Sequence, residues 1–130
     1  MFVADFMSPR PIQISPDEDL AEALAKMGKH KIRHLVVVSE DGTVKGILSD
    51  RDLAMYYDPM NMTEERWKQA RVKDLMTRDP DTIGSLSPIR SAAKLILSLA
   101  ISALPVVDNG QLKGLLTERD FVRHFAELEE

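Results

Sequence analysis

The chain contains no cysteine, no long apolar run and no excess of basic residues. The absence of cysteine excludes disulfide bonds, thiolate nucleophiles and cysteine-based zinc sites. No apolar run approaches the roughly 18 residues that span a bilayer, and the N-terminal stretch MFVADFMSPR lacks the basic start and apolar core of a signal peptide. A net charge of −4 argues against nucleic-acid binding through a general basic field. We therefore expect a cytoplasmic protein with no nucleic-acid or membrane partner.

The usual signatures of catalysis are also missing from the sequence. There is no phosphate loop of the Gly-x-x-x-x-Gly-Lys type and no nucleophile accompanied by a base. His34 and His124 are two of only three histidines, and neither has an acid or cysteine at metal-ligand spacing. We therefore expect no metal site, no required cofactor and no enzymatic activity.

What the sequence does contain is an internal repeat. Ten residues between Val3 and Val38 recur unchanged 69 positions later, and six more between Gly42 and Asp52 recur 68 positions later. A fixed period of this kind indicates a duplicated supersecondary unit, and units this small bury their apolar faces against each other. We expect repeat 1 at residues 1–57, an ordered helical linker at 58–71 and repeat 2 at 72–130.

Each repeat has the pattern strand, helix, strand, strand, helix, which is an α/β class. In repeat 1, Ile12 and Ile14 predict a short strand, Ser15–Glu18 predicts a helix start, and Leu20, Ala23, Leu24 and Met27 share one helical face. The apolar runs 35–38 and 104–107 predict covered strands, and each returns through a turn that contains glycine. The returning strands, 44–48 and 112–116, lead directly into helices near Ser49 and Thr117.

The sequence of the linker predicts a capped helix that begins near Asn61–Glu64 and runs through Ala70. Its Trp67 is the only tryptophan of the chain. We interpret this side chain as a packing anchor against the neighbouring repeat rather than a ligand-stacking platform.

The chemistry of the chain concentrates in Ser49–Asp52 and in its repeat Thr117–Asp120. In each, a hydroxyl residue ends a strand and a carboxylate follows three residues later, one turn along the helix. Such a carboxylate could accept both hydroxyls of a ribose while the hydroxyl residue and free backbone N–H groups hold a phosphate. Arg51 and Arg119 add a cation. The same spacing is also that of a helix capping box, so a purely structural role remains an alternative.

The repeated pattern closely resembles the CBS (cystathionine-β-synthase) domain, present as a tandem pair. The resemblance is carried by Met-(Ser/Thr)-x-x-Pro, by a strand such as Leu104–Asp108, and by Gly-h-(Leu/Ile)-(Ser/Thr)-x-x-Asp in both repeats. The segment Lys31–Leu35 and the helical linker are most similar to acetoin-utilisation-type CBS proteins. The resemblance implies two β-α-β-β-α repeats packed with pseudo-twofold symmetry, and adenosine-containing ligands in clefts to which both repeats contribute.

Carried over residue by residue, the resemblance implies two unequal ligand clefts. The first would consist of Ser49, Arg51, Asp52, Asp81, Thr82, Ile101, Ser102 and Pro105. The second would consist of Thr117, Arg119, Asp120, Ile12, Gln13, Ile32, Arg33, His34 and Val36. Because Arg33, His34 and Arg119 would gather in the second cleft, we expect that cleft to prefer phosphorylated ligands.

We therefore interpret the chain as a regulatory module that senses AMP, ADP or ATP and signals to an unidentified partner protein. S-adenosylmethionine and NAD rank behind these nucleotides as ligands. We also expect a homodimer, since closed twofold association is the commonest way to cover exposed apolar faces. The alternative is a structural dimerisation module that binds no ligand.

Overall fold

The computed structural model describes residues 1–129, which form two compact units. Unit 1 consists of Met1–Pro11 and Asp81–Glu130, and unit 2 consists of Ile12–Pro80. Each unit thus combines the body of one repeat with the leading segment of the other repeat. The predicted repeats were defined by sequence periodicity, whereas these units are defined by contacts and divide the chain at different residues. The predicted limits of the repeats therefore stay a prediction.

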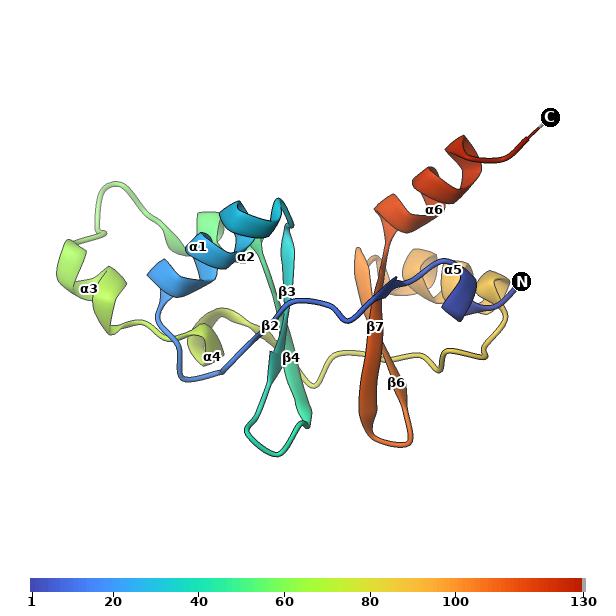
Figure 1. Cartoon of the computed structure of the whole chain (residues 1–130). Coiled ribbons are helices and arrows are strands. Elements are labelled where there is room, and N and C mark those ends of the chain that lie inside the picture. The colour runs from blue at the N-terminus through green and yellow to red at the C-terminus, as the bar shows by residue number, and fades with distance from the viewer. Residues whose placement is uncertain (130) are drawn as a thin grey trace. The chain divides into compact units, whose positions relative to one another are not determined.

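Unit 2 contains a four-stranded sheet with four helices (Figure 1). The strand order is β2-β3-β4-β5, with β2 parallel to β3 and the other neighbours antiparallel. The strands are β2 (Gln13–Ile14), β3 (His34–Val38), β4 (Val44–Ser49) and β5 (Thr77–Arg78), and the helices are α1 (Leu20–His30), α2 (Asp50–Tyr56), α3 (Glu64–Gln69) and α4 (Val72–Leu75).

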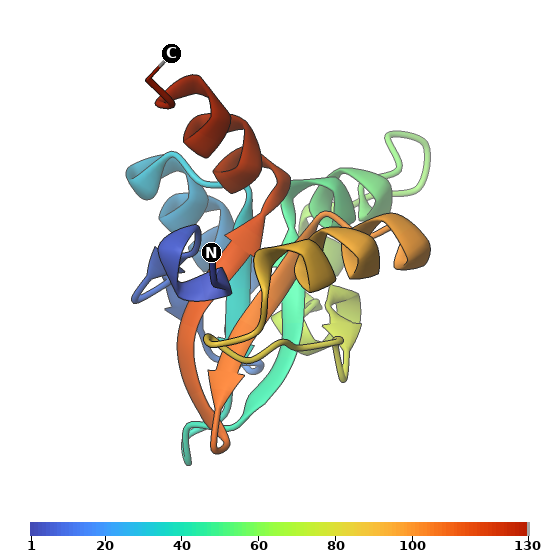
Figure 2. The ribbon, with the colours of Figure 1, turned by 90° about the vertical axis from the view of Figure 1, so that its right-hand side faces the viewer.

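Unit 1 repeats this plan around the antiparallel hairpin that Figure 2 brings to the front. Its strand order is β1-β7-β6, and a parallel bridge between Ile83 and Val106 takes the place of the β2–β3 pair. The elements are η1 (Val3–Asp5), β1 (Ser8–Pro9), α5 (Ile89–Leu99), β6 (Ala103–Asp108), β7 (Gln111–Thr117) and α6 (Glu118–Ala126). The predicted α/β class with two repeats of strands and helices is confirmed.

The first helix of each repeat begins at a different kind of cap. The side chain of Asp19 accepts a hydrogen bond from the backbone N–H of Glu22 and starts α1, so the helix start predicted at Ser15–Glu18 is wrong. That stretch instead forms a turn in which the Glu18 N–H donates to the Ser15 carbonyl. In α5 the N-cap residue is Pro88, which has no side-chain hydrogen bond to the helix. Both helices end in a left-handed residue, at Lys31 and Ala100.

The buried face of α1 follows the predicted helical spacing with one exception. Leu20, Ala23 and Met27 are buried in unit 2, whereas Leu24 is 47% exposed, which corrects its assignment to the buried face. Leu24 follows Ala23 on the helix, and a residue 100° further round turns to solvent. Unit 1 has its own core around Val3, Ala92, Ile96, Leu104, Val106 and Leu116.

The hairpin turns and the linker agree with the sequence. Asn109 and Gly110 both have positive φ (50° and 77°), as a two-residue hairpin turn of this kind requires. Trp67 on α3 packs against the core of unit 2, with its ring 6.3 Å from the rings of both Tyr56 and Tyr57. Its role as a packing anchor is confirmed, and its ring contacts lie within unit 2.

Two glycines make room for the exchanged leading segments. A Cβ at Gly46 on β4 would lie 2.6 Å from Sδ of Met76, and a Cβ at Gly114 on β7 would lie 2.6 Å from Sδ of Met7. These close approaches occur where β5 pairs with β4 and β1 pairs with β7. The repeated glycine therefore lets each leading segment lie flat on the other repeat's strand.

Candidate functional site

The first Ser-x-x-Asp group lies where β4 ends and α2 begins. The backbone N–H of Ser49 donates to Oδ2 of Asp52 at 2.8 Å, and the Asp52 N–H donates to Oγ of Ser49 at 3.1 Å. This is a complete capping box, and both residues remain partly exposed. Arg51, between them, is exposed. The group therefore caps its helix, and the box leaves Oδ1 of Asp52 unused.

The second group, at the junction of β7 and α6, has a different carboxylate. Asp120 is only 2% exposed, and its Oδ2 accepts hydrogen bonds from the backbone N–H of Thr117 at 2.7 Å and from Oγ1 of Thr117 at 3.3 Å. Its Oδ1 accepts from Oγ of Ser8 at 3.3 Å and from Nη2 of Arg123 at 2.5 Å. The two copies of one motif therefore differ in how many partners the carboxylate holds.

Sequence reasoning missed Arg123 and Ser8. Arg123 stands three residues after Asp120 on α6, a spacing that brings opposite charges together on a helix, so this ion pair could have been found. Ser8 is 112 positions away from Asp120 and comes close only because β1 pairs with β7. The equivalents of these residues in the other repeat are Met55 and Thr77.

The remaining predicted site residues fall in both units. Unit 2 contains Ile12, Gln13, Ile32, Arg33, His34 and Val36 beside the first group. Unit 1 contains Asp81, Thr82, Ile101, Ser102 and Pro105 beside the second group. Each predicted cleft takes residues from both units, so the assembly of either cleft stays a prediction.

Within unit 2, the sheet brings several of these residues side by side. Gln13 on β2 is opposite Val36 on β3, and His34 is opposite Ser49 on β4. The side chain of Arg33 is 83% exposed, and its Nε lies 4.0 Å from a carboxylate oxygen of Asp50. An ion pair this exposed contributes little, which leaves the guanidinium accessible to an anion.

Within unit 1, the corresponding residues also flank the second group. The N–H of Glu118 donates to the carbonyl of Ser102, and the N–H of Ile83 donates to the carbonyl of Pro105. Pro105 is fully buried, as is Val36 in unit 2. Asp81, Thr82, Ser102 and Arg119 are exposed.

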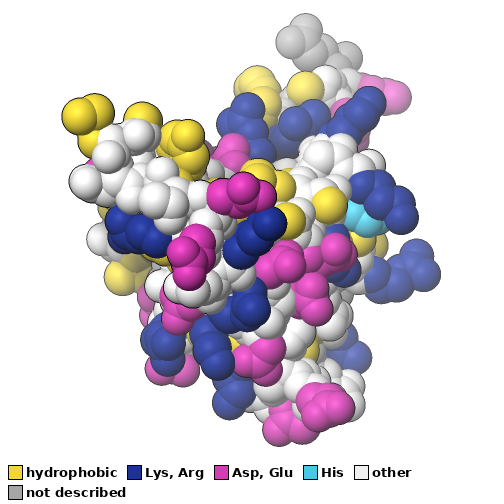
Figure 3. Space-filling model, turned by 90° about the vertical axis from the view of Figure 1, so that its left-hand side faces the viewer, with side chains coloured by type: hydrophobic (Ala, Val, Ile, Leu, Met, Phe, Trp, Pro, Cys, Tyr) yellow, Lys and Arg dark blue, Asp and Glu magenta, His cyan; other side chains and the backbone are white. Residues whose placement is uncertain are grey.

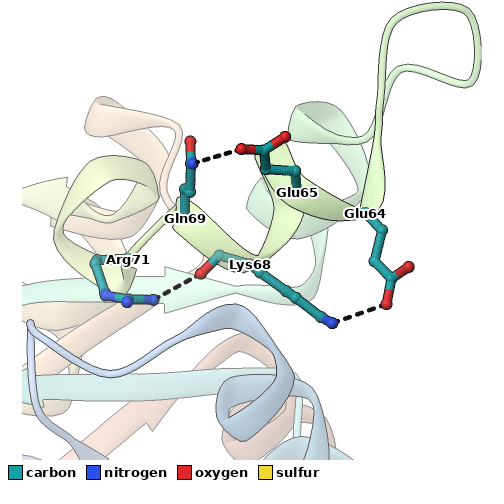
Figure 4. A pocket seen from close by; sticks show the side chains of 5 residues that line it. All are labelled: Glu64, Glu65, Lys68, Gln69 and Arg71. Atoms are coloured by element: carbon teal, nitrogen blue, oxygen red, sulfur yellow. Dashed lines mark hydrogen bonds and ion pairs between the residues drawn. The ribbon is translucent and has the colours of Figure 1, made fainter.

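Unit 2 also has surface hollows apart from the Ser49–Asp52 group. A hollow beside α3 is lined by Glu64, Glu65, Lys68, Gln69 and Arg71 (Figure 4). Its side chains bond to one another or to the adjacent backbone, with Lys68 Nζ 2.8 Å from Glu64 Oε1. Acidic and basic side chains are interspersed on the face shown in Figure 3. In residues 1–129 no three acidic or histidine side chains gather as a metal site, and no helix has the length and apolarity to cross a membrane.

Comparison with known proteins places this geometry in a family. The family model of the CBS domain matches residues 3–58 and again residues 72–127. A CBS domain-containing protein of Dictyostelium discoideum is 34% identical over 129 residues, which cover 94% of this chain and 89% of the relative. Inosine-5'-monophosphate dehydrogenase of Mycobacterium tuberculosis is 34% identical over 115 residues, covering 87% of this chain but only 20% of that enzyme.

Solved structures agree with the sequence relatives. The structure of CBSX2 in complex with AMP has a TM-score of 0.85 and 28% identity, covering 99% of both chains. A CBS domain pair in complex with 5'-methylthioadenosine and S-adenosyl-L-methionine has a TM-score of 0.83 and 28% identity, covering 97% of this chain and 96% of the other. A putative acetoin utilization protein from Vibrio cholerae has a TM-score of 0.83 and 25% identity, covering 97% and 90%. With both copies of the Ser/Thr-x-x-Asp group inside the matched segments, the chain belongs to the CBS domain family.

Proposed function

We propose that this chain is a regulatory module that binds an adenosine-containing ligand through its two Ser/Thr-x-x-Asp groups and signals its presence to a partner protein. The observation that carries the proposal is Asp52. Its carboxylate is oriented by the Ser49 N–H through one oxygen, and the capping box leaves the other oxygen unused. An oriented carboxylate is an acceptor for the paired hydroxyls of a ribose.

Similar proteins support this ligand class. One similar structure contains AMP, and another contains 5'-methylthioadenosine and S-adenosyl-L-methionine. These ligands share the adenine and the ribose and differ in what is attached at the 5' position. Of the adenosine-containing ligands we propose the phosphorylated ones, AMP, ADP or ATP, because exposed Arg33 offers a cation for a phosphate.

We propose a regulatory role because the sequence has no phosphate loop of the Gly-x-x-x-x-Gly-Lys type and no nucleophile accompanied by a base. The chain spans about a fifth of the dehydrogenases and 23% of a homoserine O-acetyltransferase from Methanocorpusculum labreanum that it resembles. The activity of those enzymes is therefore not assigned to this chain.

We propose that the module acts in the cytoplasm as a homodimer, which light scattering would detect as about twice the 14.6 kDa chain mass. A mass near that of one chain at micromolar concentration contradicts the dimer.

The second candidate is a structural dimerisation module without ligand. The specific observation in its favour is the capping box at Ser49 and Asp52, which accounts for the motif without any ligand. Both candidates predict that Asp52→Ala destabilises the chain. Only the first predicts that the same change removes ligand binding.

The test is a thermal melt with AMP, ADP, ATP, S-adenosylmethionine and NAD, each on the wild type and on Asp52→Ala. A ligand at 100 times its dissociation constant adds about 2.7 kcal/mol, which raises the midpoint of a chain of this size by about 10 °C. We expect such a rise in the wild type and a smaller one in the variant. If none of the five compounds raises the wild-type midpoint, the structural alternative is correct.

A further inference from the structure

The two aspartates of the repeated motif, Asp52 and Asp120, differ in how many hydrogen bonds their carboxylates accept in the unliganded chain. In residues 1–129, the carboxylate of Asp120 accepts four hydrogen bonds from three residues, Thr117, Ser8 and Arg123, and they occupy both of its oxygens. With 2% of its surface exposed, Asp120 has no oxygen left for a new donor. A ribose hydroxyl can reach this carboxylate only after one of these partners has moved.

Asp52 lacks two of those three partners. The position equivalent to Arg123 is Met55, which is 78% exposed and carries no donor. The position equivalent to Ser8 is Thr77, which is exposed on β5 and whose hydroxyl, in residues 1–129, makes no hydrogen bond to Asp52. In residues 1–129 the hydrogen bonds of the Asp52 side chain come from Ser49 alone, through Oδ2. Its second oxygen is therefore ready to accept.

The partner most able to move is Arg123. Its side chain is 47% exposed, so water can replace the carboxylate once the guanidinium swings away. Ser8 is held by the pairing of β1 with β7, and Thr117 by its own backbone position at the end of β7. Ligand binding at Asp120 therefore depends on breaking one charge-assisted contact that Asp52 does not have.

We infer that Arg123 closes the Asp120 group in the unliganded chain, so that a ribose-containing ligand binds first at Asp52 and at Asp120 only when Arg123 releases the carboxylate. This inference rests on the proposed function. A site that is competent only in a fraction of the molecules has its apparent affinity reduced by that fraction. A charged hydrogen bond of ordinary strength corresponds to a reduction of about 10-fold to 100-fold.

The experiment is isothermal titration calorimetry of the full chain with AMP and, separately, with S-adenosylmethionine. The wild type is compared with Asp52→Ala, with Arg123→Met, which copies Met55, and with the reciprocal Met55→Arg. Arg90→Met is the matched control, because Arg90 is exposed on α5 of the same unit and its loss changes the charge equally. Circular dichroism melts verify that each variant folds.

We expect two classes of binding in the wild type, of which the tighter is lost in Asp52→Ala. Arg123→Met should tighten the weaker class by about 10-fold or more, and Met55→Arg should weaken the tighter class by a similar factor. Arg90→Met should leave both classes as they are. If both classes are present and neither Arg123→Met nor Met55→Arg changes its class, the inference is wrong while the proposed function stands. If no variant and no wild type binds either ligand, both are wrong.

Discussion

Units 1 and 2 share one plan and one motif, yet they hold the motif's carboxylate in opposite ways. Asp52 is partly exposed and bonded to its own cap residue, whereas Asp120 is buried and bonded to residues from three places in unit 1. A duplicated sequence motif therefore does not guarantee a duplicated environment. In sequence the neighbouring positions differ at Met55, which replaces Arg123. Thr77 keeps the hydroxyl of Ser8 but, in residues 1–129, makes no hydrogen bond to Asp52.

The largest expected loss of stability comes from adding a side chain at the two repeated glycines, which both units use where a leading segment pairs with a strand. We expect Gly46→Ala and Gly114→Ala each to lower the free energy of unfolding by about 3 kcal/mol, the upper end for overpacking. The added Cβ would meet not only a methionine sulfur but also a backbone carbonyl, that of Thr77 at 2.7 Å or of Ser8 at 2.8 Å. Urea unfolding measures the loss.

The matched control for both glycines is Gly28→Ala on α1. A Cβ at Gly28 meets nothing within 4 Å, so the replacement should raise stability by roughly 0.5–1 kcal/mol through helix propensity. If Gly46→Ala and Gly114→Ala unfold at the same urea concentration as the wild type, the pairing of the leading segments does not require glycine.

The second comparison concerns the stability of the unliganded chain. Asp120→Ala should cost about 2 kcal/mol, because it removes charged hydrogen bonds to Arg123 and to Ser8 as well as the bond from the Thr117 N–H. Asp52→Ala should cost about 1 kcal/mol, the usual loss for half of a capping box. The larger loss at Asp120 follows from its burial, because the donors that it leaves behind include a guanidinium and a strand hydroxyl.

Urea unfolding of the two aspartate variants, without ligand, measures this difference. Asp19→Ala is a useful reference, since Asp19 caps α1 through a single bond to the Glu22 N–H at 2.8 Å. Equal losses for Asp52→Ala and Asp120→Ala would show that the contacts of Ser8 and Arg123 add no stability.

The smallest expected effect concerns the pKa values of two aspartates near the hairpin turns, one in each unit. Hydrogen bonds from the Ser39 hydroxyl and the Thr43 N–H lower the pKa of Asp41 in unit 2 from 3.8 to about 2. In unit 1 the hydroxyl and N–H of Ser85 lower the pKa of Asp108. Because the folded pKa of Asp41 lies below the unfolded value, its stabilisation is complete above pH 3.8 and is lost as the pH falls through about 2.

Carboxyl carbon chemical shifts recorded against pH test this prediction. The Asp41 carboxyl should titrate with a midpoint near pH 2, and Ser39→Ala should move that midpoint upward while leaving Asp108 unchanged. Ser85→Ala is the reciprocal control and should move only Asp108. An unshifted Asp41 midpoint of about 3.8 in the wild type would contradict the turn geometry.

The sequence by itself determined the features that depend on neighbours along the chain. The alternation of strands and helices, the Asn109–Gly110 turn and the capped linker helix are local patterns, and the structure confirms them. The period of 69 residues is also visible in the sequence alone, because it requires only that two segments be compared. The start of α1 was misplaced because Ser15 and Asp19 are both good caps, and nothing local decides between them. The two Ser/Thr-x-x-Asp groups could be located, and their ligand role stays a proposal.

The tertiary structure alone decided which leading segments pair with the other repeat and which of the two carboxylates is buried. Ser8–Pro9 of the first leading segment pairs with β7, and Thr77–Arg78 of the second pairs with β4. No periodicity along one segment predicts such a pairing, because it joins strands that are not neighbours in the sequence. The burial of Asp120 follows from it, since the bond from Ser8 joins residues 112 positions apart and exists only after β1 has docked on β7.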